Sequence, residues 1–227
     1  MNKYKTTKAA ILEKLNKPLV IKNIELPKKL YRGQVLVKMK YTGICGSQIG
    51  EISGIKGPDK FLPHLLGHEG FGQVIDVGPG VRYVKKNDMV VLHWKPGKGI
   101  DAINPQYQFM GKIINAGKVT TFSNLTIVSE NRLTSIKKKY ILNEYLMPLF
   151  GCAVTTGFGV VDNFSKNIKN KNVVIFGAGG VGLTILKACL LKNAKNIIIV
   201  DKTLSKLKLA KKHGATHILN STNLNLL

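Results

Sequence analysis

Residues 173–182 read Val173-Val174-Ile175-Phe176-Gly177-Ala178-Gly179-Gly180-Val181-Gly182, and this stretch decides the fold of the second half of the chain. An apolar strand runs directly into the pattern G-x-G-x-x-G. Gly177 allows a tight turn, Gly179 lets the backbone approach a pyrophosphate, and Gly182 permits close packing of a helix on a strand. The pyrophosphate would lie at the N-terminus of that helix. The candidate dinucleotide-binding residues in the turn are therefore Gly177, Gly179, Gly180, Val181 and Gly182.

The next apolar strand ends in Asp201, which lies 19 residues beyond Gly182. In dinucleotide-binding folds, an acidic residue about 20 residues after the glycines bonds the adenosine ribose. Asp201 favours NAD because a carboxylate repels a 2′-phosphate, whereas Lys202 is a weaker signal for NADP. The alternative is a glycine-rich loop that binds no dinucleotide, with Asp201 capping the helix that begins near Thr203.

Strands and helices alternate around this motif. We expect strands at 172–176, 196–200 and 217–219, and helices at 181–191 and 204–212. This order implies a parallel sheet with right-handed crossovers. The second half is thus predicted to be an α/β unit, the first half of a Rossmann domain.

The first half of the chain has the pattern of β-structure, with Gln34–Tyr41 as its clearest two-residue period. We expect strands at 5–11, 19–25, 34–41, 71–77, 89–93 and 125–128. Many short strands in a row predict a partly open β-barrel. The predicted domains are residues 1–145 for the barrel and residues 146–227 for the partial dinucleotide-binding domain.

Cys45, His68 and Cys152 are the candidate metal ligands. Two thiolates and an imidazole form a Cys2His set, an arrangement of catalytic zinc that keeps a fourth position open. Zinc in such a site polarises a carbonyl or lowers the pKa of an alcohol. Taken singly, each residue has another explanation, because a lone Cys is often a small core residue and His68 is equally consistent with a structural role.

Three segments resemble, in order, the zinc segments of the medium-chain zinc-dependent alcohol dehydrogenase family. They are residues 43–47 (GICGS), 67–70 (GHEG) and 151–157 (GCAVTTG), all upstream of the glycine turn or close before it. The resemblance implies a GroES-like catalytic domain with Cys45, His68 and Cys152 on one catalytic zinc ion. It also implies Glu69 beside the metal or exchanging with a ligand, and Ser47 as the hydroxyl that takes the alcohol proton.

The same resemblance implies hydride transfer between NAD and a small alcohol, polyol or sugar-derived substrate. The intact family member is expected to be a cytoplasmic homo-oligomer. A complete dinucleotide fold has two halves, and only the first is present, so we expect a C-terminally truncated chain with weak or no turnover. The alternatives are a non-catalytic remnant that binds zinc or nucleotide, and a basic nucleic-acid-binding protein.

The chain departs from the family pattern at three places. Gln48 stands where the family often has Asp, and Gly50 stands where many members have a proton-relay His. Residues 93–121 contain no cysteine, so no structural zinc is expected there. The unusual segment His93–Ile100 is expected to cover the barrel rather than to border the substrate cleft.

The remaining candidates are weaker. His64 is interpreted as a surface-loop histidine in preference to a residue that supports the metal site. Cys189 is predicted to pack in the core of the α/β unit, and His213 and His217 to be structural or exposed.

The formal charge of the chain is +23, yet only three of its 35 basic residues are arginines. Because recognition of phosphates and bases favours Arg, we interpret the charge as lysine bias rather than a nucleic-acid surface. Three widely spaced cysteines favour a reducing compartment over a disulfide framework. No apolar run reaches the roughly 18–20 residues of a membrane helix, so no membrane span is expected.

Overall fold

The structure is a computed structural model that describes residues 4–141, 143–164 and 167–222. The chain forms two compact units, Met1–Cys152 and Ala153–Leu227. The predicted division at 145/146 lies before this point. The 3₁₀ segment η3 (Glu144–Gly151) packs on strands of the first unit and therefore belongs to it.

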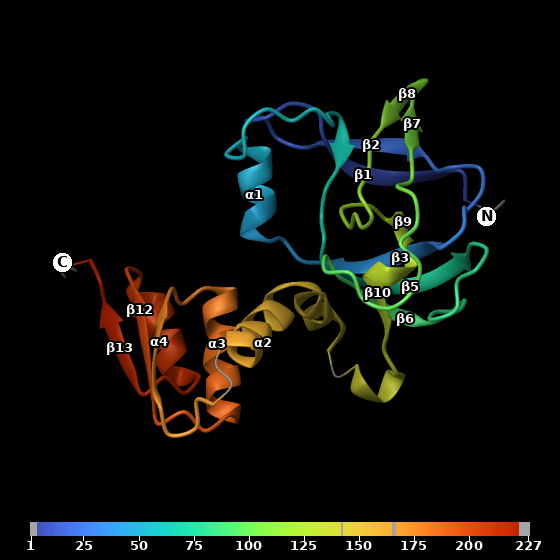
Figure 1. The fold of residues 1–227 in the computed structure, drawn as a ribbon. Coiled ribbons are helices and arrows are strands. Elements are labelled where there is room, and N and C mark those ends of the chain that lie inside the picture. The colour runs from blue at the N-terminus through green and yellow to red at the C-terminus, as the bar shows by residue number, and fades with distance from the viewer. Residues whose placement is uncertain (1–3, 142, 165–166, 223–227) are drawn as a thin grey trace. The chain divides into compact units, whose positions relative to one another are not determined.

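The first unit consists of two five-stranded sheets, seen as two layers in Figure 1. One sheet has the order β4-β1-β2-β7-β8, with β1 (Thr6–Leu12), β2 (Val20–Glu25), β4 (His64–Leu65), β7 (Tyr107–Phe109) and β8 (Lys112–Ile114). The other has the order β10-β6-β5-β3-β9, with β3 (Gln34–Thr42), β5 (Gly70–Val77), β6 (Met89–Leu92), β9 (Leu125–Ser129) and β10 (Leu133–Ser135). An isolated bridge between Ala9 and Ser123 joins the two sheets, which confirms the partly open barrel.

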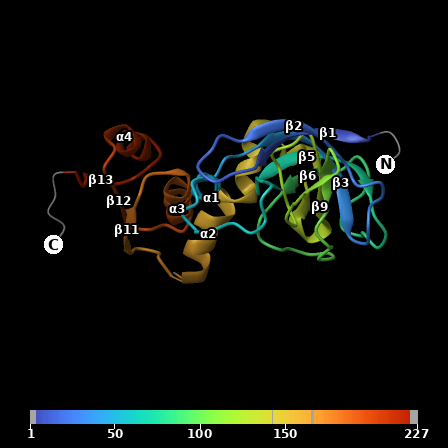
Figure 2. The same cartoon turned by 90° about the horizontal axis from the view of Figure 1, so that it is seen from above.

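Apolar side chains from both sheets meet between the two layers. Ile11 of β1, Leu36 of β3 and Ile127 of β9 are fully buried in one cluster. Tyr107 lies in the same cluster, and its hydroxyl accepts a 2.8 Å hydrogen bond from the Ile127 N–H. Burial raises the pKa of Tyr107 to about 12. This core holds both sheets in place, and helix α1 (Gly46–Ile52) lies outside them (Figures 1 and 2).

Glu130, in η1 (Glu130–Arg132), is a carboxylate that is only 1% exposed. Its oxygens accept hydrogen bonds from the backbone N–H groups of Arg82, Tyr83 at 2.8 Å and Ile100 at 2.8 Å. Burial raises the pKa of the Glu130 carboxyl, but these donors and the Arg82 charge outweigh it and hold the pKa below its usual value. Glu130 therefore ties the loops around residues 82 and 100 to the end of β9.

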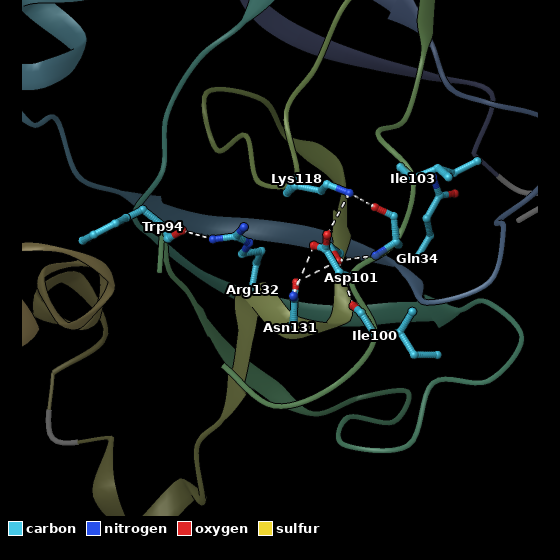
Figure 3. A network of polar contacts seen from close by, with 10 residues as sticks. Gln34, Trp94, Ile100, Asp101, Ile103, Lys118, Asn131 and Arg132 are labelled. Atoms are coloured by element: carbon cyan, nitrogen blue, oxygen red, sulfur yellow. Dashed lines mark hydrogen bonds and ion pairs between the residues drawn. The ribbon is translucent and has the colours of Figure 1, made fainter. Parts of the chain in front are cut away.

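The segment around residue 100 is also held by a polar network, shown in Figure 3. Lys118 forms a 3.2 Å ion pair with Asp101 and donates to the Ala102 carbonyl. Asn131 donates to Asp101 at 3.2 Å. Arg132 donates to the carbonyl of Trp94. These contacts attach the segment that contains no cysteine to the barrel.

The second unit has a three-stranded parallel sheet in the order β11-β12-β13. Its elements are α2 (Ala153–Phe164), β11 (Asn172–Phe176), α3 (Gly180–Leu191), β12 (Asn196–Asp201), α4 (Leu204–Lys212) and β13 (His217–Asn220). The three strands lie side by side in Figures 1 and 2. The predicted α/β half-fold is confirmed, with strand and helix limits within one residue of those expected.

The core of this unit lies between the sheet and its helices. Ile197 and Ile199 of β12 pack in one cluster with Leu186 of α3 and Leu207 of α4. Cys189 is 1% exposed in the same cluster, as predicted, and burial raises the pKa of its thiol. His213 and His217 lie at the exposed surface.

Two further elements are the 3₁₀ segment η2 (Lys138–Tyr140) and the pair formed by η3 and α2. Among the described residues, no single helix is long and apolar enough to cross a membrane. Taken together, the bent pair of η3 and α2 is long and apolar enough by composition. Buried core helices of soluble proteins meet the same criterion, so this is weak evidence.

We expect Glu130→Ala to lower the free energy of unfolding of the first unit by about 2–4 kcal/mol, since three backbone N–H groups lose a charged acceptor. Urea titration followed by the fluorescence of Trp94, the single tryptophan of the chain, measures this change. Glu25→Ala, at an exposed carboxylate of β2, is the control and should change the free energy by less than about 0.5 kcal/mol. Equal effects of both variants would contradict the assigned role of Glu130.

The Glu130 carboxyl also makes the stability of the first unit depend on pH. The pKa of Glu130 is lower in the folded chain than in the unfolded chain. Its contribution is therefore complete above the unfolded pKa of about 4.3 and is lost as the pH falls through the folded value. The Glu130→Ala variant should lack this part of the acid sensitivity.

Candidate metal and nucleotide sites

The end of β5 at Gly70 brings two of the predicted metal ligands together. Gly70 pairs with Thr42 of β3 on one side and with Leu92 of β6 on the other. Cys45 follows β3 by three residues, and His68 precedes β5 by two. Both residues therefore emerge at the same end of the same sheet, although they are distant in sequence.

Cys152 reaches this place through η3. The backbone of Gly151 is so close to β6 that a Cβ atom there would lie 2.2 Å from the Leu92 carbonyl oxygen. The Trp94 N–H donates to the Gly151 carbonyl at 3.4 Å. A glycine is thus required at 151, and the close approach delivers the buried Cys152 beside the end of β5.

The ligand atoms of Cys45, His68 and Cys152 all lie within 4.8 Å of one another, inside the first unit. The two Sγ atoms are 4.0 Å apart. Two Zn–S bonds of about 2.3 Å at a tetrahedral angle place sulfurs roughly 3.8 Å apart. The spacing of the thiols therefore fits a shared zinc ion.

His68 has one ring nitrogen engaged and one without a partner. Its Nδ1 lies 2.6 Å from the amide of Gln48, whereas its Nε2 is buried and has no hydrogen-bond partner among the described residues. Burial lowers the pKa of His68, and the charge of Lys56 lowers it further. The neutral imidazole is therefore favoured, with a lone pair available to a cation.

The orientation of the Gln48 amide follows from the protonation of His68 that metal binding requires. An imidazole that binds metal through Nε2 carries its proton on Nδ1 and must donate it. The acceptor is then Oε1 of Gln48, which is otherwise buried with no partner in the described chain. A half-turn of the amide exchanges its oxygen and nitrogen. Oε1 of Gln48 then accepts from the Nδ1–H of His68, so that this donor and this acceptor are both satisfied. Gln48 is 4% exposed, so its position is fixed by packing.

The two predicted catalytic residues lie near this site. Glu69 is 3% exposed, and its carbonyl accepts a 3.1 Å hydrogen bond from the Gly43 N–H. Ser47 is exposed on α1, two residues after Cys45. Glu69 is thus a buried carboxylate and Ser47 an exposed hydroxyl, and both are near neighbours of candidate ligands in the sequence. Their catalytic roles stay predictions.

The predicted nucleotide residues lie in the second unit. Gly177 has φ +96°, and a Cβ atom at Gly182 would lie 1.9 Å from the Gly177 carbonyl oxygen, so both positions need glycine. The oxygens of Asp201 accept from the N–H groups of Ala178 at 2.8 Å and Thr203 at 2.7 Å. These two donors lower the pKa of Asp201. The carboxylate is thereby fixed beside the turn, with the exposed Lys202 next to it.

The interpretation of His64 as a surface-loop histidine was wrong. His64 is 7% exposed, because it begins β4 and packs inside the first unit. Its Nε2 lies 2.8 Å from Asp59 and its Nδ1 lies 3.0 Å from the Leu65 carbonyl. Sequence reasoning also missed Asp59 and Glu51, whose only signal was their acidity in a strongly basic chain.

Residues 31–138 match the family model described as the alcohol dehydrogenase GroES-like domain. A curated relative, S-(hydroxymethyl)glutathione dehydrogenase from Photobacterium damsela subsp. piscicida, is 35% identical over 237 aligned positions. These positions cover 89% of this chain and 61% of the relative. Residues 31–138 are therefore a GroES-like domain of the alcohol dehydrogenase type. The chain as a whole is similar to zinc-dependent alcohol dehydrogenases.

A second curated relative matches the chain to a similar extent. The S-(hydroxymethyl)glutathione dehydrogenase of Synechocystis is 32% identical, over 94% of this chain and 64% of the relative. The chain therefore spans about three fifths of the length of these curated relatives.

Solved alcohol dehydrogenase structures match the fold over almost the whole chain. The zinc-binding domain protein from Burkholderia ambifaria has a TM-score of 0.85 at 26% identity and covers 97% of this chain and 65% of its own. Benzyl alcohol dehydrogenase from Acinetobacter calcoaceticus has a TM-score of 0.83 at 27% identity, covering 98% and 66%.

We expect Gln48→Leu to weaken zinc binding to this chain by about 10–100-fold, because the Nδ1–H of His68 then lacks an acceptor. Competition against a chromophoric chelator measures the affinity. Gln48→Asp restores an acceptor and should recover most of the loss. Gln106→Leu, at an exposed glutamine of the same unit, is the matched control. Unchanged affinity in Gln48→Leu would contradict the orienting role.

Proposed function

We propose that this chain carries the metal and nucleotide sites of a zinc-dependent, NAD-linked oxidoreductase that acts on alcohols. The observation that carries the proposal is the convergence of Cys45, His68 and Cys152 within 4.8 Å. Three groups far apart in sequence meet there with the donor chemistry that zinc prefers.

The donor set fits zinc on features of this chain alone. The buried Nε2 of His68 makes no hydrogen bond among the described residues. Its lowered pKa keeps the ring neutral near pH 7. Three protein ligands leave a fourth position for substrate. When bound, zinc supplies Lewis-acid polarisation of an alcohol or carbonyl oxygen, and NAD accepts the hydride.

Each nearby residue then has a definite task. Cys45, His68 and Cys152 hold the ion, and Gln48 fixes the ring of His68. The exposed hydroxyl of Ser47 takes the alcohol proton and passes it to solvent, since Gly50 offers no side chain for a relay. Buried Glu69 adds negative charge beside the ligands.

The second unit is proposed to bind the nucleotide. The exposed Gly179 and Gly180 leave the backbone N–H groups at the start of α3 open to a pyrophosphate. Asp201, held beside the turn by Ala178 and Thr203, bonds the ribose hydroxyls. Its charge favours NAD over NADP. A homo-oligomeric state of the full-length enzyme stays a prediction.

Zinc reconstitution with NAD and a panel of primary and secondary alcohols tests the activity. We expect at most weak NADH formation, which Cys152→Ser should lower at least about 100-fold, since the loss of a zinc ligand removes the polarising ion. Cys189→Ala, a thiol of the other unit's core, is the control and should retain activity in the fraction that folds. Zinc binding without turnover by any alcohol would favour the non-catalytic alternative.

Gly179→Val tests the nucleotide site separately. A Cβ atom at 179 meets no atom within 4 Å, so the fold should tolerate the change. The added side chain blocks the pyrophosphate, and we expect NADH affinity to fall about tenfold or more in a fluorescence titration. Gly159→Ala, in α2 of the same unit, should bind NADH normally. NADPH should bind the unaltered chain more weakly than NADH, and equal affinity would contradict the role of Asp201.

A further inference from the structure

Thr121 is a threonine in the segment that precedes β9, and its side chain is only 1% exposed. This segment is fixed by both sheets of the first unit. The Ala10 N–H of β1 donates to the Phe122 carbonyl at 2.9 Å. The Met39 N–H of β3 donates to the Asn124 carbonyl at 2.9 Å. Thr121 therefore lies in a segment that is held by a strand of each sheet.

The loop that carries His68 wraps around Thr121. The N–H groups of Thr121 and Phe122 both donate to the Leu66 carbonyl, at 3.0 and 3.2 Å. Gly67 has φ +91°, and a Cβ atom there would clash with the hydroxyl oxygen of Thr121. Only glycine therefore fits at 67. His68 comes directly after these contacts, so the path of its backbone depends on the position of Thr121.

The hydroxyl of Thr121 reaches the far end of the same loop through Thr42. The two hydroxyl oxygens are 2.7 Å apart, and this is the one side-chain hydrogen bond of Thr121 in the described part of the chain. Thr42 has the Glu69 carbonyl oxygen at 3.1 Å and the Gly43 carbonyl oxygen at 3.2 Å. Because the buried proton of Thr121 needs an acceptor, Thr121 donates to Thr42. Thr42 then donates onward to the carbonyl of Glu69, the nearer acceptor.

The carbonyl of Glu69 also joins the two loops that carry candidate ligands. It accepts a 3.1 Å hydrogen bond from the N–H of Gly43, which lies two residues before Cys45. One carbonyl thus binds both the loop that leads to Cys45 and the hydroxyl chain that starts at Thr121. Because Glu69 directly follows His68, a displacement of this carbonyl changes the separation of Cys45 and His68.

We propose that Thr121 is a positioning residue of the metal site, whose hydroxyl sets the separation of Cys45 and His68 through Thr42 and the Glu69 carbonyl. This role differs from that of Gln48, which bonds the imidazole itself. The inference rests on the proposed function, because it gives Thr121 a task toward the proposed ion. Loops that are fixed in advance lower the cost of ordering the ligands, so loss of the hydroxyl should weaken metal binding.

Cobalt binding followed by absorption tests this role without turnover. Co²⁺ on Cys45 and Cys152 gives thiolate charge-transfer bands, and competition with a chelator gives the apparent Kd. We expect Thr121→Val to raise this Kd about three- to tenfold, since a buried hydrogen bond is lost with little change in side-chain volume. Thr121→Ser keeps the hydroxyl and should restore most of the affinity. An unchanged Kd in the folded Thr121→Val variant would overturn the proposal.

Thr7→Val separates positioning from general stability. Thr7, in β1, is 4% exposed, and its hydroxyl accepts from the Leu125 N–H at 2.8 Å. The variant thus loses a comparable buried bond that belongs to neither ligand loop, and its Kd for Co²⁺ should change less than about twofold. Trp94 fluorescence checks that each variant is folded at the temperature of the titration. Equal weakening of cobalt binding by both valine variants would contradict the positioning role.

Thr42→Val completes a double-mutant cycle with Thr121→Val. Alone, it should also raise the Kd about three- to tenfold. Because Thr121 acts through Thr42, adding Thr121→Val to Thr42→Val should raise the Kd further by less than about twofold. Fully additive effects would refute the hydroxyl chain. Absence of the thiolate bands in the unaltered chain is a distinct result, which would overturn the proposed metal site and the role of Thr121 with it.

Discussion

The close approach of three chain segments at the end of β5 is the constraint on which the rest of the site depends. Gly70 is paired on both sides, by Thr42 and by Leu92, so the residues that follow β3 and precede β5 have little freedom. Gly151 then presses directly on the Leu92 carbonyl, where no side chain fits. The sheet itself therefore positions two thiols and one imidazole before any ion is bound. Such preorganisation reduces the cost of ordering the ligands on metal binding.

The amide of Gln48 orients the histidine of this site. A carboxylate at this position would accept from the imidazole without offering a donor on its other side. An amide has one acceptor and one donor group, so Gln48 can bond Nδ1 of His68 whether or not that nitrogen carries the proton. The orientation of the histidine thus depends on one side chain.

Carboxylates also organise the loops of the first unit. Glu130 collects three backbone N–H groups from two separate loops, and the region without cysteines is anchored to it and to the Asp101–Lys118 pair. Asp59 fixes the loop that leads into β4 by the same kind of bond. At Glu130 the charged acceptor satisfies three backbone donors of the loops that it joins. The barrel therefore keeps long connections ordered.

The sequence by itself determined the class of fold, the alternation of strands and helices in the second unit, and the glycine turn, because these features depend on local periodicity and on residues that are neighbours in the chain. It also indicated the candidate metal ligands through resemblance to a family. Only the tertiary structure decided that Cys45, His68 and Cys152 meet, that His64 is buried, and that Glu130 serves as a clamp. Helix α1, with Gln48 and Glu51 on one face, gave no clear periodic signal, because it has only seven residues. These features arise from contacts between distant segments, and neither spacing nor composition encodes which distant segments meet.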